Sequence, residues 1–122
     1  MKSNKLDKVY LVVFLILEFI IFFVFKYFDI SDIKIIIKPI AIQYELKKVF
    51  LFGSYAKGNA TPNSDIDLLI EKGKPLSLLK LAGLRQTFQD NLNLPVDLIT
   101  TSGIDQDFLN EIHGTEVLLY EA

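Results

Sequence analysis

Residues 47–70 read KKVFLFGSYAKGNATPNSDIDLLI. Two short apolar runs, KKVFLF at 47–52 and DIDLLI at 65–70, stand at its two ends, and each has the length and the flanking turn residues of a buried strand. The loop between them is rich in Gly, Asn, Thr, Pro and Ser, which favour turns. The stretch therefore predicts two strands joined by a loop that carries polar and acidic side chains.

The segments on either side of this stretch predict helices. From residue 30 onward, apolar residues recur at spacings of three and four, so we expect a helix there. Ser31 or Asp32 is expected to cap it, and Pro39 to interrupt or kink it. The segment at 76–92 has the same spacing and predicts a second helix. Its apolar residues that we assign to the core are Leu78, Leu79, Leu81 and Leu84.

Beyond residue 92 a third strand, a helix and a further extended segment are expected. PVDLIT at 95–100 predicts the strand, and Ser102 or Asp105 is expected to start the helix. The tail at 116–121 is either a fourth extended segment or a surface for strand exchange. The order of these elements predicts an α/β (α+β) fold, in which a small mixed β-sheet has helices packed on one face.

The composition indicates one domain without disulfide or zinc chemistry. A length of 122 residues is enough for one domain with a core of its own. The chain has no cysteine, and His113 as the single histidine cannot build a zinc site, so we expect it to be a surface residue. A net charge of -2 without a basic run makes long nucleic acids poor candidates for substrates.

Three aspartates lie on the predicted strands. Asp65 and Asp67 are two apart, so on a strand both side chains leave the same face. Adjacent carboxylates repel each other, and one of them takes up a proton unless a cation lies between them. Oxygen ligands without His or Cys select magnesium or manganese. If the strand at 95–100 lies beside the strand at 65–70, Asp97 completes a cluster of three carboxylates that can hold a second ion.

The beginning of the loop is suited to binding phosphate. Gly53 allows the backbone to turn sharply and to approach a ligand closely. Ser54 offers a hydroxyl and an amide at the expected start of a short helix. Together these two residues suit the phosphate tail of a triphosphate, whereas Tyr55 is expected to pack in the interior.

This combination resembles the nucleotidyltransferase superfamily related to DNA polymerase beta. The motif of that superfamily is Gly-Ser, ten residues, Asp-x-Asp, and a third Asp on a later strand. The matching residues here are Gly53, Ser54, Asp65, Asp67 and Asp97. FGSYAKG and SDIDLLI are similar to the corresponding segments of the minimal nucleotidyltransferases that act as antitoxin partners of HEPN-domain toxins. The likeness covers about residues 30–122 and implies the nucleotidyltransferase core fold.

The resemblance implies how the nucleotide is held. The backbone at Gly53 and the side chain of Ser54 would bind the β- and γ-phosphates. Lys57 stands where the family usually has Arg, which keeps a positive charge near the phosphates but loses the two-pronged hydrogen bonding of a guanidinium.

The resemblance also implies catalysis with two magnesium ions. Asp65 and Asp67 would ligate both ions, and Asp97 would ligate the ion that activates the incoming hydroxyl. In such sites one ion lowers the pKa of the attacking hydroxyl, and the other stabilises charge on the α-phosphate and on the departing pyrophosphate.

The function that the resemblance implies is the transfer of AMP from ATP to a tyrosine of a cognate HEPN ribonuclease toxin, which makes the chain an antitoxin. The residues alone select neither the base of the triphosphate, nor the acceptor, nor the oligomeric state. One alternative is an antitoxin that neutralises its toxin by binding, and another is a small-molecule nucleotidyltransferase. The latter needs a helical substrate domain after the core, and the sequence ends about twenty residues after the third strand, which favours a macromolecular acceptor.

Residues 1–28 form a hydrophobic N-terminal extension to the domain at 30–122. Residues 9–25 predict an apolar helix about 25 Å long, which is short for a bilayer span, and Glu18 makes insertion costly. We favour a misassigned start or a dispensable appendage over a membrane anchor or a partner-binding helix. The lysines before the run would leave the catalytic domain outside the cell, away from ATP. We therefore expect a cytoplasmic enzyme, with membrane association possible only through residues 9–25.

Overall fold

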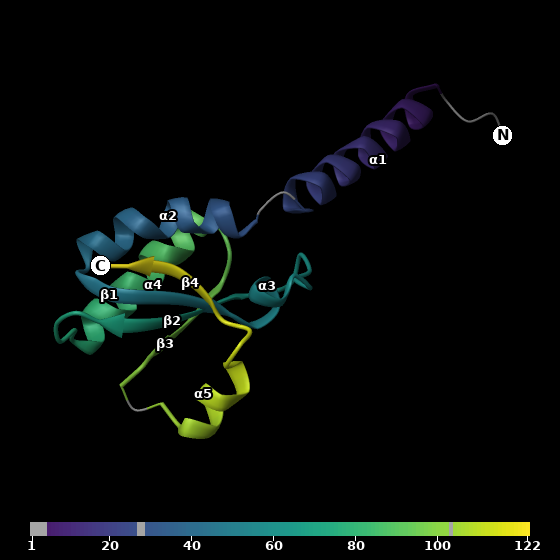
Figure 1. Cartoon of the computed structure of the whole chain (residues 1–122). Coiled ribbons are helices and arrows are strands. Elements are labelled where there is room, and N and C mark those ends of the chain that lie inside the picture. The colour runs from purple at the N-terminus through teal and green to yellow at the C-terminus, as the bar shows by residue number, and fades with distance from the viewer. Residues whose placement is uncertain (1–4, 27–28, 103) are drawn as a thin grey trace.

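The computed structural model describes residues 5–26, 29–102 and 104–122, with side chains described except at 22–26. Five helices and four strands follow one another along these residues (Figure 1). In chain order they are α1 (Lys5–Lys26), α2 (Ile30–Gln43), β1 (Leu46–Phe52), α3 (Gly53–Lys57), β2 (Ile66–Lys72), α4 (Leu78–Leu92), β3 (Val96–Thr100), α5 (Gln106–Ile112) and β4 (Val117–Glu121).

The four strands form one mixed sheet in the order β3-β2-β1-β4. The central strand β1 pairs antiparallel with β2 on one side and with β4 on the other. The pairing of β2 with β3 is parallel, since α4 carries the chain back along the sheet between them. The predicted mixed sheet is confirmed, and the tail at 116–121 contributes an edge strand of this sheet.

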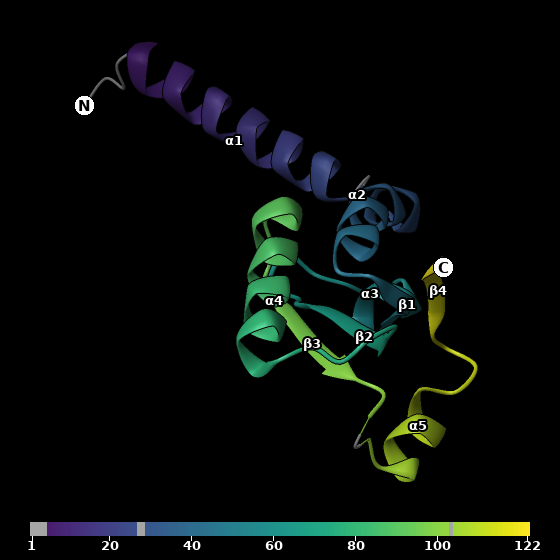
Figure 2. The ribbon, with the colours of Figure 1, turned by 90° about the vertical axis from the view of Figure 1, so that its left-hand side faces the viewer.

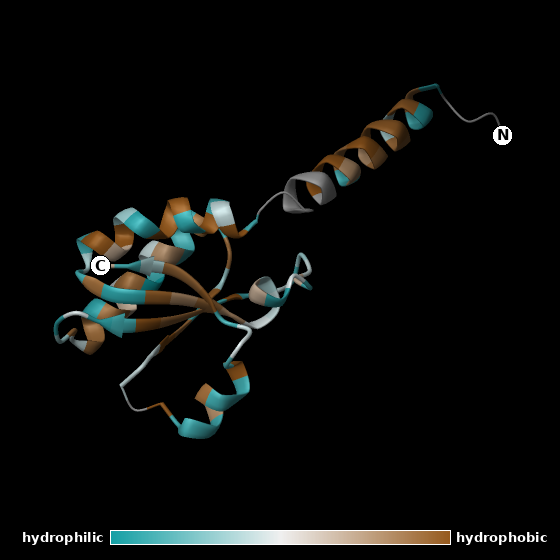
Figure 3. Ribbon diagram, in the orientation of Figure 1, coloured by the Kyte–Doolittle hydropathy of each residue, from teal (hydrophilic) through white to brown (hydrophobic). Residues whose placement is uncertain are grey.

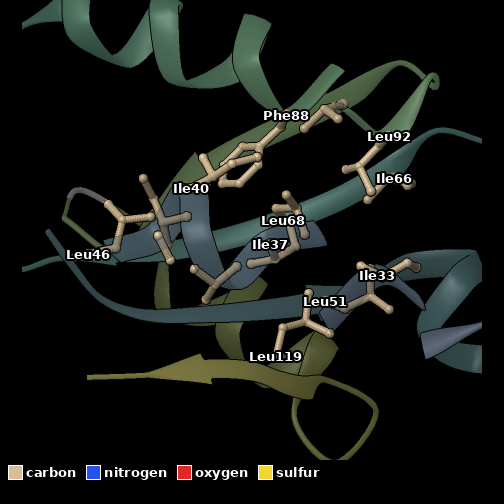
Figure 4. Close-up of a cluster of buried hydrophobic side chains, with 14 of the residues drawn as sticks. Ile33, Ile37, Ile40, Leu46, Leu51, Ile66, Leu68, Phe88, Leu92 and Leu119 are labelled. Carbon is tan, nitrogen blue, oxygen red and sulfur yellow. The ribbon is translucent and has the colours of Figure 1, made fainter. Parts of the chain in front are cut away.

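Helices α2 and α4 cover one face of the sheet, as predicted (Figures 1 and 2). The core lies between this helical layer and the sheet, and Figure 4 shows side chains from both meeting there. The largest fully buried side chains are Phe88, Ile33, Ile37, Leu46, Leu51, Ile66, Leu68, Ile70, Leu84, Val49 and Val96. Helix α5 lies outside this layer, beyond the end of β3.

The N-cap of α2 lies two or three residues before the predicted one, Ser31 or Asp32. Asp29 is the N-cap, and its side chain accepts a hydrogen bond from the backbone N–H of Asp32 at 3.1 Å. The Asp32 carboxylate accepts one from the backbone N–H of Asp29 in return, so each aspartate satisfies an otherwise unpaired donor. Pro39 lies on the exposed side of α2, and the helix continues past it to Gln43, so it does not interrupt the helix.

The assignment of Leu78 and Leu79 to the core was wrong. These side chains are 85% and 84% exposed, in the first turn of α4. The buried stripe begins at Leu81, which is partly buried, and continues through Leu84, Phe88 and Leu92 at helical spacing. Helical periodicity identified the correct face of α4, but it did not indicate where along the helix the opposing layer begins.

Helix α1 projects away from the sheet and its helical layer (Figure 1). Its surface is apolar around most of its circumference (Figure 3), and the described side chains from Leu6 to Ile21 are all exposed. In the part of the chain that the structure describes, no helix is both long and apolar enough to cross a membrane. The side chains at 22–25, which belong to the predicted apolar run, lie outside the described residues.

Candidate active site

The turn from β1 into α3 packs directly against the side chain of Asp67. Gly53 has a φ of 72°, in the left-handed region that glycine adopts most readily. A Cβ atom at this position would overlap Oδ2 of Asp67, and it would lie 3.1 Å from Cγ. Gly53 therefore provides both the backbone conformation and the space that the Asp67 carboxylate occupies.

Strands β2 and β3 place Asp67 beside Asp97. The two residues are register partners in the parallel pairing, and Phe52 is the register partner of Asp67 on β1. The adjacent residues Leu51 and Leu68 are fully buried on the face covered by α2 and α4. Because side chains alternate along a strand, Phe52, Asp67 and Asp97 lie on the opposite face.

Asp65 lies near Asp67, as predicted, but not because both residues belong to one strand. Strand β2 begins at Ile66, so Asp65 precedes the strand and does not share its alternation. It still lies close enough for its charge to affect Asp67. Asp65 and Asp97 are exposed, whereas Asp67 is half-buried.

The three carboxylates form an electrostatically unfavourable group. Burial raises the pKa of Asp67 above its usual value, and the neighbouring charges of Asp97 and Asp65 raise it further. A positive ion bound at this position would favour the charged form of Asp67 and so oppose this rise in its pKa. Carboxylate oxygens are the ligands that a hard cation such as Mg²⁺ prefers.

A magnesium ion bound here needs ligands from outside the protein as well. Among the described residues, no three His, Cys, Asp or Glu side chains form a group that could hold a metal ion. Mg²⁺ usually takes only one or two carboxylates from a protein and completes its octahedron with water and phosphate oxygens. Asp67 with its neighbours Asp65 and Asp97 fits that kind of shared site.

Ser54 and Lys57 lie on the short helix α3. Ser54 is its second residue and is half-buried, and its carbonyl oxygen accepts a hydrogen bond from the backbone N–H of Asn59 at 3.0 Å. Lys57 is the last helical residue and is exposed, and Gly58 ends the helix in the left-handed conformation. Tyr55 is buried in the core, as predicted, and burial raises its pKa.

Two features beside the site were absent from the predicted set. One is the aromatic contact between Phe52 and Phe108 of α5, whose ring centroids are 5.4 Å apart in an edge-to-face arrangement. No sequence pattern links residues so far apart.

The second feature beside the site is a hydrogen-bonded turn at residues 61–64, just before Asp65. Its sequence TPNS carries the turn residues that could have indicated it.

Comparison with known proteins identifies an enzyme family that matches the part of the chain from residue 35 onward. The family model described as polymerase beta, nucleotidyltransferase, matches residues 35–122. A Methanocaldococcus jannaschii protein with the provisional name protein adenylyltransferase is 40% identical over 86 residues, which are 67% of this chain and 88% of that protein. Protein adenylyltransferase MntA of Thermococcus cleftensis is 33% identical over 62% of this chain and 80% of its own length.

Solved structures share the fold at lower sequence identity. A toxin-antitoxin crystal structure with AMP-PNP superposes with a TM-score of 0.65 at 23% identity, over 73% of both chains. The complex of a tri-AMPylated Shewanella oneidensis HEPN toxin with an MNT antitoxin gives a TM-score of 0.60 at 19% identity, over 76% of this chain and 73% of that one. The match of the family model to residues 35–122, together with relatives that are 33–40% identical to this chain over the aligned residues, shows that this chain belongs to the polymerase beta nucleotidyltransferase family.

Proposed function

We propose that this nucleotidyltransferase transfers AMP from ATP to a tyrosine hydroxyl of a cognate HEPN ribonuclease toxin and thereby acts as its antitoxin. The observation that carries the proposal is the contact of Gly53 with the Asp67 carboxylate, next to Asp97 on the adjoining strand. This contact supports the proposal because it lies between the turn that we assign to phosphate binding and a carboxylate that we assign to cation binding.

In this proposal the beginning of α3 binds the triphosphate. The backbone turns at Gly53 into α3, and Ser54 offers its hydroxyl and its backbone N–H one residue later. Lys57, at the exposed end of α3, supplies a positive charge on the same short helix. The adjacent carboxylates would repel the triphosphate in the absence of cations, so binding of nucleotide and of magnesium should depend on each other.

Asp65, Asp67 and Asp97 are the proposed ligands of two magnesium ions shared with the phosphates. When bound, such ions lower the pKa of an attacking hydroxyl and offset the charge that develops on the phosphates. The role of the protein side chains is to hold the carboxylates together and to align the donor with the acceptor. Asp67 is the half-buried member of this group, and the charges of the other two act on it.

The proposed reaction is an in-line displacement at the α-phosphorus of ATP. The acceptor hydroxyl oxygen forms a bond to this phosphorus. The bond between the α-phosphorus and the oxygen that bridges to the β-phosphate breaks. Pyrophosphate leaves, and the hydroxyl proton passes to solvent. The product is an O-adenylylated protein, and no oxidant or reductant takes part.

The acceptor is proposed from the named relatives. Those with similar sequences carry the name protein adenylyltransferase, which supports a protein hydroxyl as acceptor and AMP as the transferred group. The fold neighbour from Shewanella oneidensis is an MNT antitoxin in complex with a tri-AMPylated HEPN toxin, which supports a HEPN toxin as partner. Neutralisation by binding alone is the competing mechanism, since an antitoxin in complex with its toxin need not modify it.

The working unit in this proposal is the domain at 30–122, located in the cytoplasm where ATP is available. The family model starts at residue 35, within α2, and all the proposed site residues lie after it. Helix α1 contributes none of them. We propose that residues 1–28 are not needed for catalysis.

A labelling experiment separates catalysis from neutralisation by binding. The chain is incubated with magnesium, ATP labelled at the α-phosphate, and a small helical protein that is encoded beside it or co-purifies with it. We expect label on that protein from the native chain and from Asp90→Asn, which changes an exposed aspartate on α4. The double variant Asp65→Asn/Asp67→Asn should transfer none. Continued labelling by the double variant would overturn the catalytic assignment, and continued protection of cells without labelling would favour neutralisation by binding.

A further inference from the structure

The loop that leads into β2 contains a turn at residues 61–64. Its first and last residues, Thr61 and Ser64, each donate a backbone hydrogen bond to the other. The backbone N–H of Ser64 donates to the carbonyl oxygen of Thr61 at 3.0 Å, which closes a β-turn with Pro62 in the position that favours proline. The backbone N–H of Thr61 donates in return to Oγ of Ser64 at 2.8 Å. The backbone N–H of Asn63 also donates to Oγ1 of Thr61 at 3.3 Å.

Asp65 lies between this turn and a second fixed point. The next residue, Ile66, donates its backbone N–H to the carbonyl oxygen of Pro95 at 2.9 Å, which joins the beginnings of β2 and β3. Since Asp65 itself precedes β2, its location depends on Ser64 on one side and Ile66 on the other. Loss of either constraint would let the exposed Asp65 backbone move.

Movement of the Asp65 backbone would weaken binding of a cation. Asp65 and Asp67 repel each other without a cation, and a free loop would relax by separating them. The free energy of cation binding would then be reduced by the cost of ordering the loop, in addition to the cost of removing water from the ion. A turn that is already closed removes this ordering cost, because the carboxylate is held in place before the ion arrives.

We propose that Ser64 is a positioning residue for binding of the divalent cation, and that its hydroxyl closes the 61–64 turn and thereby holds the Asp65 carboxylate beside Asp67. The inference rests on the proposed function only in that Asp65 and Asp67 share a divalent cation. It does not depend on the identity of the acceptor.

The test measures Mn²⁺ binding and uses two substitutions at Ser64 with a matched control. Ser64→Ala removes the hydroxyl, and Ser64→Thr keeps it. Ser77→Ala is the control, because Ser77 accepts the same kind of bond, from the backbone N–H of Lys80 at 3.2 Å, at the start of α4. Free and bound Mn²⁺ are measured by electron paramagnetic resonance, with an ATP analogue whose α–β bridge cannot be cleaved. Thermal unfolding is recorded for each variant.

We expect Ser64→Ala to weaken Mn²⁺ binding on the order of tenfold, the effect typical of residues that orient metal ligands. Ser64→Thr should restore native affinity, and Ser77→Ala should lower the melting temperature without changing Mn²⁺ affinity. Pro62→Gly, which loosens the turn and keeps both hydroxyls, should weaken binding in the same direction. It serves as the second variant if Ser64→Ala does not fold.

The outcomes separate this inference from the proposed function. Native Mn²⁺ affinity in folded Ser64→Ala and Pro62→Gly overturns the positioning role, while transfer to a toxin would still stand. Weakened Mn²⁺ binding in these variants, without adenylylation of any protein by the native chain, supports the positioning role and overturns the proposed function. Absence of Mn²⁺ binding by the native chain overturns both.

Discussion

The α-carbon of Gly53 faces the carboxylate of Asp67 so closely that a β-carbon at Gly53 would overlap the Asp67 oxygen Oδ2. This contact joins the turn after β1 to the half-buried member of the aspartate group. It makes Gly53 a position at which the smallest substitution should act on the active site itself.

We predict that Gly53→Ala abolishes most of the transfer activity, because the added methyl group must displace Asp67. A displacement of about 1 Å can lower the rate about 100-fold. Gly58→Ala is the matched control, since Gly58 has a similar φ of 76° with nothing within 4 Å of the added carbon. Both variants should lose about 1–2 kcal/mol of stability from the left-handed backbone. Equal activity of the two variants would contradict the prediction.

Asp67→Asn should stabilise the metal-free protein while it removes activity. The pKa of Asp67 is raised in the folded chain, so its negative charge opposes folding at neutral pH. This unfavourable contribution begins as the pH rises above the usual aspartate pKa and is complete above the raised one. The melting temperature of the variant should therefore exceed that of the native chain at pH 7, and the difference should disappear in acid.

Magnesium provides the control for the Asp67→Asn experiment. If Asp67 binds the ion, added Mg²⁺ with nucleotide should raise the melting temperature of the native chain and leave that of the variant unchanged. A variant that is less stable than the native chain at pH 7 without metal would show that the charge of Asp67 is not the dominant effect there.

Ser54→Ala should reduce binding of the triphosphate more than binding of the metal. The hydroxyl lost from α3 is the proposed phosphate ligand, whereas the carboxylates belong to β2 and β3 and to the residue before β2. We expect loss of transfer with Mn²⁺ uptake retained in the absence of nucleotide, measured by titration calorimetry. If manganese uptake also collapsed, phosphate and metal binding could not be assigned to separate residues.

Deletion of residues 1–28 should leave the transfer activity unchanged. The truncated chain keeps Asp29, which caps α2 through its bond with the backbone of Asp32, so the first helix of the domain can still form. Activity with the cognate toxin and the melting temperature are the measurements.

Two further experiments concern the extension itself. Intact mass of the natively expressed protein identifies its start, and fractionation tests for a membrane anchor. Recovery of the full chain in membranes, with activity lost on truncation, would defeat this prediction.

The order of the elements could be read from the sequence because local patterns encode it. A short apolar run that ends at a glycine identified β1, helical spacing identified α4, and the Gly-Ser and Asp-x-Asp pattern pointed to one loop and its flanking strands. The errors fall at element ends. Asp29 caps α2 where Ser31 or Asp32 was expected, and Leu78 is exposed because burial depends on the neighbouring layer.

By itself, the sequence determined which residues could do chemistry, because the types and spacing of Gly53, Ser54, Asp65 and Asp67 are local properties of the chain. Only the tertiary structure decided that Asp97 lies beside Asp67, since that neighbour depends on which strand pairs with β2. It also decided that Gly53 faces the Asp67 carboxylate and that Phe108 meets Phe52. Contacts of this kind arise when distant segments bury their apolar faces together, and local periodicity carries no information about which segments will meet.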